Sequence, residues 1–203
     1  FALPGQVSIR DGIVQWGHYN KLKHFIAVST TSEDLQETVR DYPASGASCV
    51  LIHAQRPGKR VFSPDGTSIV SWEGERILLE IRAANTLDML PIVLLYNPDE
   101  SCHLESTEAY GKAAATLSQM VSDAALWYLP CVVTEGAAKE WGSIDTKEVI
   151  SITAAAIREV KRNQVVAAGS ADAAFNRALF EGDAPVHVLA AYADHLEPVG
   201  DAP

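Results

Sequence analysis

Short apolar runs alternate with longer, more polar stretches along most of this chain. Five runs follow one another at 25–28, 49–53, 92–96, 130–133 and 165–169, and a sixth covers 185–192. Near-continuous apolar runs of this length are typical of parallel strands that are buried on both faces. We therefore predict six strands of one parallel sheet.

Helices are predicted between most of these strands. Segments 72–88, 107–126 and 146–161 carry apolar residues at helical spacing, as Ile77, Ile81 and Ala84 show in the first. Hydroxyl caps and early acids predict two more helices, one ending near residue 41 and one ending near residue 179. This alternation predicts an α/β fold with right-handed crossovers, and periodicity alone leaves both an open doubly wound sheet and a closed barrel.

Two segments depart from the alternation. Asp11-Gly12 separates the apolar residues of 7–9 from those of 13–16, and this dipeptide favours the tight turn of a β-hairpin. We expect the hairpin, within residues 1–20, to belong to a single domain that spans 1–203. The polar stretch 55–67 contains Pro57-Gly58 and predicts a long loop, and loops of this length are usually functional or mobile.

Composition narrows the range of partners. The chain has 203 residues, 47% of them hydrophobic and 21% charged, as in an ordinary globular protein. Its net charge of −10 argues against nucleic acid or an anionic membrane as the main partner. No apolar run approaches the roughly 20 residues that a membrane-spanning helix needs. The chain begins with Phe1 and not Met, so we expect that residues preceded it, and no signal peptide is recognisable.

Several common kinds of site are missing from the sequence. It contains no GxGxxG, GxxxxGK[ST] or GxSxG motif, so neither a nucleotide fold nor a serine hydrolase is indicated. Cys49 and Cys131 open apolar runs and are expected to be buried thiols, whereas Cys102 is expected to be a loop thiol. We expect neither a disulfide framework nor a cofactor.

The fourth apolar run stops just before a carboxylate. Glu135 follows it, with Gly136 next in the chain. Barrels and open α/β sheets carry their chemistry at the carboxyl ends of their strands, which is where a catalytic acid would lie. The alternative is a solvated loop glutamate, and the nearby Lys139 and Glu140 are consistent with that interpretation.

The order of these features resembles the clan-A type of glycoside hydrolases, which are (β/α)8 barrels of the TIM-barrel type. The segments VSIRDG, SCVLIHAQRP and SWEGERILLEIRAANTLDMLPIVLLYN carry the resemblance, which covers most of residues 7–195. In that family the fourth strand ends in an Asn-Glu pair whose Glu is the acid/base, and here Thr134-Glu135 stands there. The family's sixth strand often ends near a His and a Tyr, for which AAYADH supplies Tyr192 and His195.

Two departures from the family pattern affect the implied mechanism. Thr134 replaces the Asn that would hold the 2-hydroxyl of the sugar. The family's nucleophile follows a seventh strand, whereas the predicted strands here number six. A full barrel needs about 250 residues. We therefore expect a barrel-like parallel sheet that is shortened, or whose remaining strands lie outside these residues.

Glycoside hydrolysis needs a proton donor and a second carboxylate that acts as nucleophile or base. The resemblance implies that Glu135 is the general acid, and Asp194, at the end of the sixth run, is the best local candidate for the second role. Asp99 and Glu100 are weaker candidates. The expected carbohydrate-binding residues are His53, Asn97, Trp141, Tyr192 and His195.

Each of these residues has an alternative interpretation. His53 follows an apolar strand and also fits a structural histidine. A metal site of His53, His195 and Glu135 has no local spacing signature, so no metal is predicted. Trp141 and Trp72 fit a sugar-stacking surface or residues that fix loops. The rival to a glycoside hydrolase is a non-catalytic structural or interaction module that retains the barrel and lacks the nucleophile.

Overall fold

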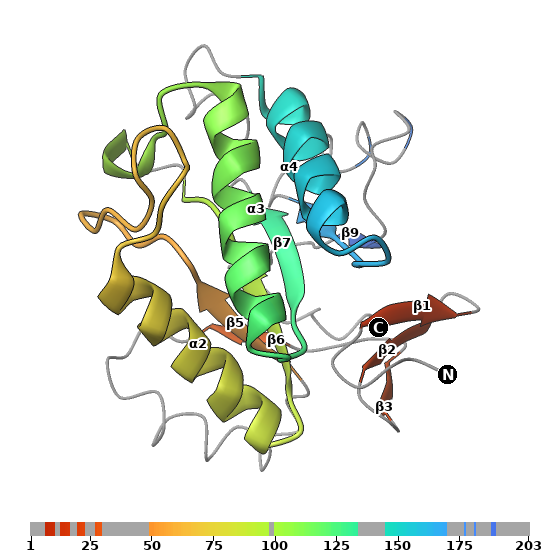
Figure 1. Cartoon of the computed structure of the whole chain (residues 1–203). Coiled ribbons are helices and arrows are strands. Elements are labelled where there is room, and N and C mark those ends of the chain that lie inside the picture. The colour runs from red at the N-terminus through yellow and green to blue at the C-terminus, as the bar shows by residue number, and fades with distance from the viewer. Residues whose placement is uncertain are drawn as a thin grey trace, which may run out of the picture.

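A computed structural model gives the fold (Figure 1). It describes residues 7–10, 13–16, 20–22, 27–29, 49–97, 100–133, 145–169, 177, 181 and 188–189. The predicted helices near residues 33–41 and 172–179 lie almost entirely outside these residues. Among the described residues, no helix combines the length and apolar character that crossing a bilayer would require.

Six parallel strands form the main sheet, as the sequence predicts. They are β4 (Ala27–Ser29), β5 (Cys49–His53), β6 (Leu90–Leu94), β7 (Leu129–Val133), β8 (Ala167–Gly169) and β9 (Val188–Leu189). Every neighbouring pair is parallel, and the strands are ordered in space as they are in the chain, from β4 to β9. A doubly wound sheet would reverse this order at a switch point, so the described strands do not form one.

The described strands do not close into a barrel. β4 and β9 are the two edges of the sheet, and no pairing joins them in the described part of the chain. The structure thus confirms a parallel α/β sheet wound in one direction, which is a coarser result than the shortened, barrel-like sheet of the TIM-barrel type that the sequence predicts.

Some strand boundaries differ from the prediction. The third run was expected at 92–96, but β6 starts at Leu90 and ends at Leu94. Its second residue is Pro91, and β7 likewise has Pro130 in second position, next to the strand start where the lack of a backbone N–H is tolerated. Beyond β6, the Leu95 amide still donates to the Cys131 carbonyl at 3.0 Å, so hydrogen bonding between the strands continues past the assigned end.

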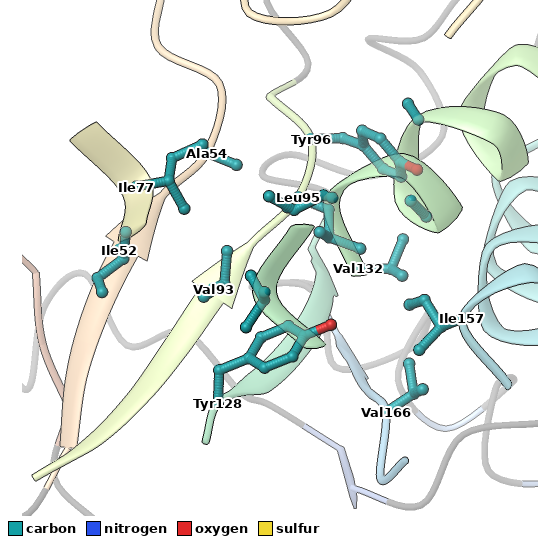
Figure 2. Close-up of a cluster of buried hydrophobic side chains, with 14 of the residues drawn as sticks. Ile52, Ala54, Ile77, Val93, Leu95, Tyr96, Tyr128, Val132, Ile157 and Val166 are labelled. Atoms are coloured by element: carbon teal, nitrogen blue, oxygen red, sulfur yellow. The ribbon is translucent and has the colours of Figure 1, made fainter. Parts of the chain in front are cut away.

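Three helices cover one face of this sheet. They are α2 (Ser71–Thr86), α3 (Thr107–Asp123) and α4 (Thr146–Val160), close to their predicted ranges. In Figure 1 they lie together on one side of the strands. Figure 2 shows the buried core between the two layers, which includes Ile52 of β5 and Ile77 of α2 at one end and Val132 of β7 and Ile157 of α4 at the other.

The alternate strand residues form the other face. Cys49 and Leu51 of β5, Ile92 and Leu94 of β6, and Cys131 of β7 are buried in a second apolar cluster. Because side chains alternate between the faces of a strand, these residues point away from the helix layer.

The N-terminal residues form a small antiparallel sheet of β1 (Ser8–Arg10), β2 (Ile13–Trp16) and β3 (Asn20–Leu22) (Figure 1). Arg10 pairs with Ile13, so residues 11 and 12, which lie outside the described residues, connect β1 to β2. The third strand was not predicted, because its sequence NKL carries no apolar pattern. Val7 and Val14 pack into the second apolar cluster of the main sheet.

Candidate functional site

The parallel strands all end at one edge of the sheet, which we call the carboxyl edge. His53, the last residue of β5, pairs with Leu94, the last residue of β6. One residue further on, the Ala54 amide donates to the Leu94 carbonyl at 2.8 Å. Asn97 follows β6 by three residues. The structure therefore places two of the predicted sugar-binding residues, His53 and Asn97, beyond adjacent strands at the same edge.

His53 lies half-buried at this edge. It alternates with Ile52, which packs under the helices, so its side chain belongs to the face away from them. Burial lowers the pKa of the imidazole from its ordinary value of 6.5, and the nearby charges of Arg76 and Arg56 lower it further. A neutral imidazole has one donor and one acceptor nitrogen, the combination that a sugar hydroxyl can use.

Gln55 links the segments that follow β5 and β6. Its side-chain oxygen accepts a hydrogen bond from the backbone amide of Asn97 at 3.0 Å. Its side-chain nitrogen donates to the backbone carbonyl of Cys102 at 2.9 Å. The side chain is only 3% exposed. Sequence reasoning missed Gln55, and the one available signal was a polar residue two positions after a buried strand.

The long loop between β5 and α2 is fixed against the next part of the chain. The Gly58 amide donates to Ser101 Oγ at 2.9 Å, and the Glu105 amide donates to the Pro64 carbonyl at 3.0 Å. Gly66 packs so closely on α3 that a Cβ there would lie 2.0 Å from the Ala109 carbonyl oxygen. The predicted loop thus forms an ordered wall beside the carboxyl edge.

Cys102 was expected to be a loop thiol, in contrast to two buried thiols. It does lie in the connection between β6 and α3, but it is buried like the other two. It ends the short 3₁₀ helix η2 (Glu100–Cys102), it is 3% exposed, and its thiol faces the Arg56 carbonyl at 3.4 Å. All three cysteines are free and buried. The polar residues around Cys102 in the sequence hid its burial, because the loop after β5 covers it.

One arginine of α2, Arg76, joins two glutamates of the same helix to the end of β5. Arg76 donates to the carbonyls of His53 and Ala54 at 3.2 and 2.8 Å, and so holds α2 against the strand end. Its guanidinium also contacts Glu73 at 2.6 Å and Glu80 at 2.9 Å. Glu73 is fully buried, and its second oxygen has no hydrogen-bond partner in the described part of the chain.

The other predicted site residues follow later strands of the sheet in the sequence. Five of them lie outside the described residues: Glu135, Trp141, Tyr192, Asp194 and His195. Glu135 follows β7 by two residues in the sequence, and Asp194 follows β9 by five. Trp72 is described: it lies in the first turn of α2 and is 56% exposed.

A metal centre was not predicted. Within the described ranges no three His, Cys, Asp or Glu side chains gather as a metal site would require. Two of the residues weighed for such a site, Glu135 and His195, lie outside those ranges.

Comparison with known proteins shows which solved structures have a similar fold. No family model matches the chain, and no curated protein matches it in sequence. Among solved structures, the β-mannanase of the blue mussel Mytilus edulis is similar with a TM-score of 0.60 and 16% identity, over 83% of this chain and 64% of that one. The exo-β-1,4-mannosidase of an Opitutaceae bacterium matches with a TM-score of 0.53 and 14% identity, over 71% of this chain and 31% of that one.

A third similar structure is the catalytic domain of the major endoglucanase of Xanthomonas campestris pv. campestris. It matches with a TM-score of 0.53 and 11% identity, over 95% of this chain and 68% of that one. The chain spans less than two thirds of the mannanase and the mannosidase. At these identities the comparisons concern the fold, and they confirm the predicted resemblance to glycoside hydrolases at that level.

Proposed function

We propose that this chain acts on or binds carbohydrate at the carboxyl edge of its sheet, as a glycoside hydrolase does. The observation that carries the proposal is the fold shared with several glycoside hydrolases, together with His53 and Asn97 at that edge. The residues that recognise a ligand in barrel folds lie at this edge. The proposal includes the finer fold assignment, in which β4 to β9 form the wall of a (β/α)8-type barrel.

In this proposal Glu135 is the general acid. It follows β7, which lies between β6 and β8 in the sheet. Asn97 follows the neighbouring strand β6, so both residues come after adjacent strands. Cleavage of a glycosidic bond requires a proton on the leaving oxygen, which a protonated Glu135 would supply. Asp194 would act as the second carboxylate, at a distance of about 5 to 9.5 Å that determines retention or inversion.

The other residues would recognise the sugar. Neutral His53 and the side-chain amide of Asn97 offer both donors and acceptors to hydroxyl groups. Trp141 would present a flat apolar surface to one face of a sugar ring. Tyr192 and His195 would contact hydroxyls from the side of β9. Gln55 would keep Asn97 in place relative to His53 through its hydrogen bond to the Asn97 amide.

The test is hydrolysis of a panel of β-1,4-linked oligosaccharides, measured as released reducing ends. Glu135→Gln keeps the shape of the side chain and removes the proton, so the rate should fall by roughly 10²- to 10⁴-fold while binding persists. An aryl glycoside whose leaving group needs no proton should lose far less rate. Glu140→Gln, a neighbouring acid in the same stretch, serves as the matched control and should leave both rates unchanged.

Two results would overturn the enzyme assignment. One is a chain that cleaves no member of the panel, and the other is a Glu135→Gln variant that cleaves natural substrates as fast as the parent. Binding without cleavage would indicate the non-catalytic module. Failure to bind any oligosaccharide would remove the proposed function altogether.

A further inference from the structure

A tight turn beside the carboxyl edge contains positively charged residues. It comprises Arg56, Pro57, Gly58 and Lys59, and is closed by the Lys59 amide, which donates to the Arg56 carbonyl at 3.0 Å. Gly58 has φ of +70°, the left-handed conformation that follows proline in a type II turn. The turn begins three residues after His53, so it belongs to the wall of the proposed site.

Besides its own backbone hydrogen bond, the turn contacts the segment that contains Ser101 and Cys102. Its Gly58 amide donates to Ser101 Oγ, and the Cys102 thiol contacts the Arg56 carbonyl. Arg56 and Lys59 form an isolated antiparallel bridge, so they lie opposite one another, and Arg60 follows directly. Like charges placed opposite each other are destabilising. The fold therefore places the backbones of two cationic residues, Arg56 and Lys59, opposite each other, with a third, Arg60, next in the chain.

Acids of the described part of the chain pair with only one of these three cations. Lys59 and Arg60 are exposed, and neither forms a salt bridge with any acid in the described part of the chain. Arg56 contacts Glu73 only at 3.7 Å, whereas the same Glu73 oxygen lies 2.6 Å from Arg76. Glu73 is therefore engaged mainly by Arg76.

Two further details describe how the polar groups near this turn are paired. The Nε atom of Arg56 is buried and has no hydrogen-bond partner in the described part of the chain, and an unpaired buried donor is costly. Asp65 is the acid of this loop, and its carboxylate accepts hydrogen bonds from the hydroxyls of Ser63 and Thr67, two residues away on either side. The positive cluster is also unusual for a chain with a net charge of −10.

We infer that the carbohydrate is anionic, and that Arg56, Lys59 and Arg60 bind a carboxylate or sulfate group on a sugar adjacent to the one held by His53 and Asn97. This inference rests on the proposed function and specifies its substrate class. Guanidinium groups bind carboxylate and sulfate oxygens through paired N–H donors, and the exposed Lys59 adds a point charge.

Matched oligosaccharides test the inference. A β-1,4-mannan hexamer, the corresponding β-1,4-mannuronate and a sulfated mannan hexamer share a backbone and differ in charge. Binding is measured by calorimetry on the chain carrying Glu135→Gln, so that no ligand is cleaved. At least one charged ligand should bind about tenfold or more tightly than neutral mannan, and added salt should weaken only the charged complexes. Whichever charged ligand binds better identifies carboxylate or sulfate as the group recognised.

Charge-removing variants locate the binding group. Lys59→Gln with Arg60→Gln should remove most of the preference for the charged ligand while neutral mannan still binds. Arg56→Gln, made separately, should also reduce this preference. The matched control is Arg82→Gln with Arg162→Gln. Both of these arginines are exposed: Arg82 lies in the second half of α2, and Arg162 follows α4 by two residues. Both helices lead back to the opposite edge of the sheet. The control should leave the preference intact.

Different failures have different meanings. Equal binding of neutral and charged hexamers overturns this inference and leaves the proposed function standing. The same holds if the control variant is as damaging as the turn variants, or if polyacrylate, a polyanion without sugar, binds as tightly as the mannuronate. Absence of binding to all the oligosaccharides overturns the inference and the proposed function together.

Discussion

The side-chain oxygen of Gln55 accepts a hydrogen bond from the backbone amide of Asn97 at 3.0 Å. With its amide nitrogen bound to the Cys102 carbonyl, this one buried side chain joins the segment after β5 to the segment after β6. The relative position of His53 and Asn97, two candidate ligand-binding residues from separate strands, therefore depends on Gln55.

Replacing Gln55 with methionine should destabilise the protein. Methionine has a similar volume but leaves the Asn97 amide and the Cys102 carbonyl without their partner, so we expect the free energy of unfolding to fall by about 1–3 kcal/mol. Urea denaturation measures this. Gln119→Met is the control, because Gln119 is exposed and donates to Asp123 on its own helix, and it should change stability by less than about 0.5 kcal/mol. Equal effects of the two substitutions would contradict this role for Gln55.

Two glycines of the β5–α2 loop should respond differently to alanine. Gly58 and Gly66 have φ of +70° and +74°, so alanine is strained at both. At Gly58 a Cβ meets nothing within 4 Å, whereas at Gly66 it would lie 2.0 Å from the Ala109 carbonyl oxygen. Gly58→Ala should cost about 1 kcal/mol of stability, and Gly66→Ala should cost clearly more, because the loop must move off α3. Similar losses in thermal denaturation would show that this contact does not hold the loop.

His53 should make stability dependent on pH. Its folded-state pKa lies below 6.5, mainly because of burial, so between that pKa and 6.5 the unfolded chain binds more protons than the folded one. Stability therefore falls as pH falls through this range. Urea unfolding from about pH 8 to about pH 5 should show a larger loss for the parent than for His53→Gln. A constant difference between the two proteins across this range would contradict the assignment.

The sequence predicted the sheet well because its strands are buried on both faces. Runs such as 49–53 and 130–133 contain almost no polar residue, and buried parallel strands require this. The helices followed from periodicity, which Ile77, Ile81 and Ala84 preserve as a fully buried line. The strand β3 could not be predicted, since its three residues carry no apolar pattern.

The candidate site was only partly predictable. Strand ends are visible in the sequence, so His53 and Asn97 could be assigned to the carboxyl edge in advance. The hydrogen bonds of Gln55 and the burial of Cys102 arise from contacts between loops that are more than 40 residues apart in the chain, and no local pattern encodes such contacts. Glu135, Trp141, Tyr192, Asp194 and His195 stay predictions.

The end of α3 offers a stabilising substitution. Ala125, just beyond the C-cap Ala124, has φ of +53°, where a side chain is unfavourable and glycine is preferred. Ala125→Gly should therefore raise the free energy of unfolding by up to about 1 kcal/mol. Ala155→Gly, at an exposed position within α4, should instead lower it by about 1 kcal/mol. Destabilisation of both variants in urea would contradict this account of the helix end.

The central claim is that carbohydrate binds at the carboxyl edge, over His53 and Asn97. Backbone amide chemical shifts, followed by NMR while the tightest-binding oligosaccharide of the panel is titrated into the chain, test it most directly. We predict saturable shifts at residues 53–60 and 95–103, with no comparable change at Cys49, Leu90 and Leu129, which begin their strands at the opposite edge. Shifts confined to that opposite edge, or none at saturating ligand, would contradict the claim.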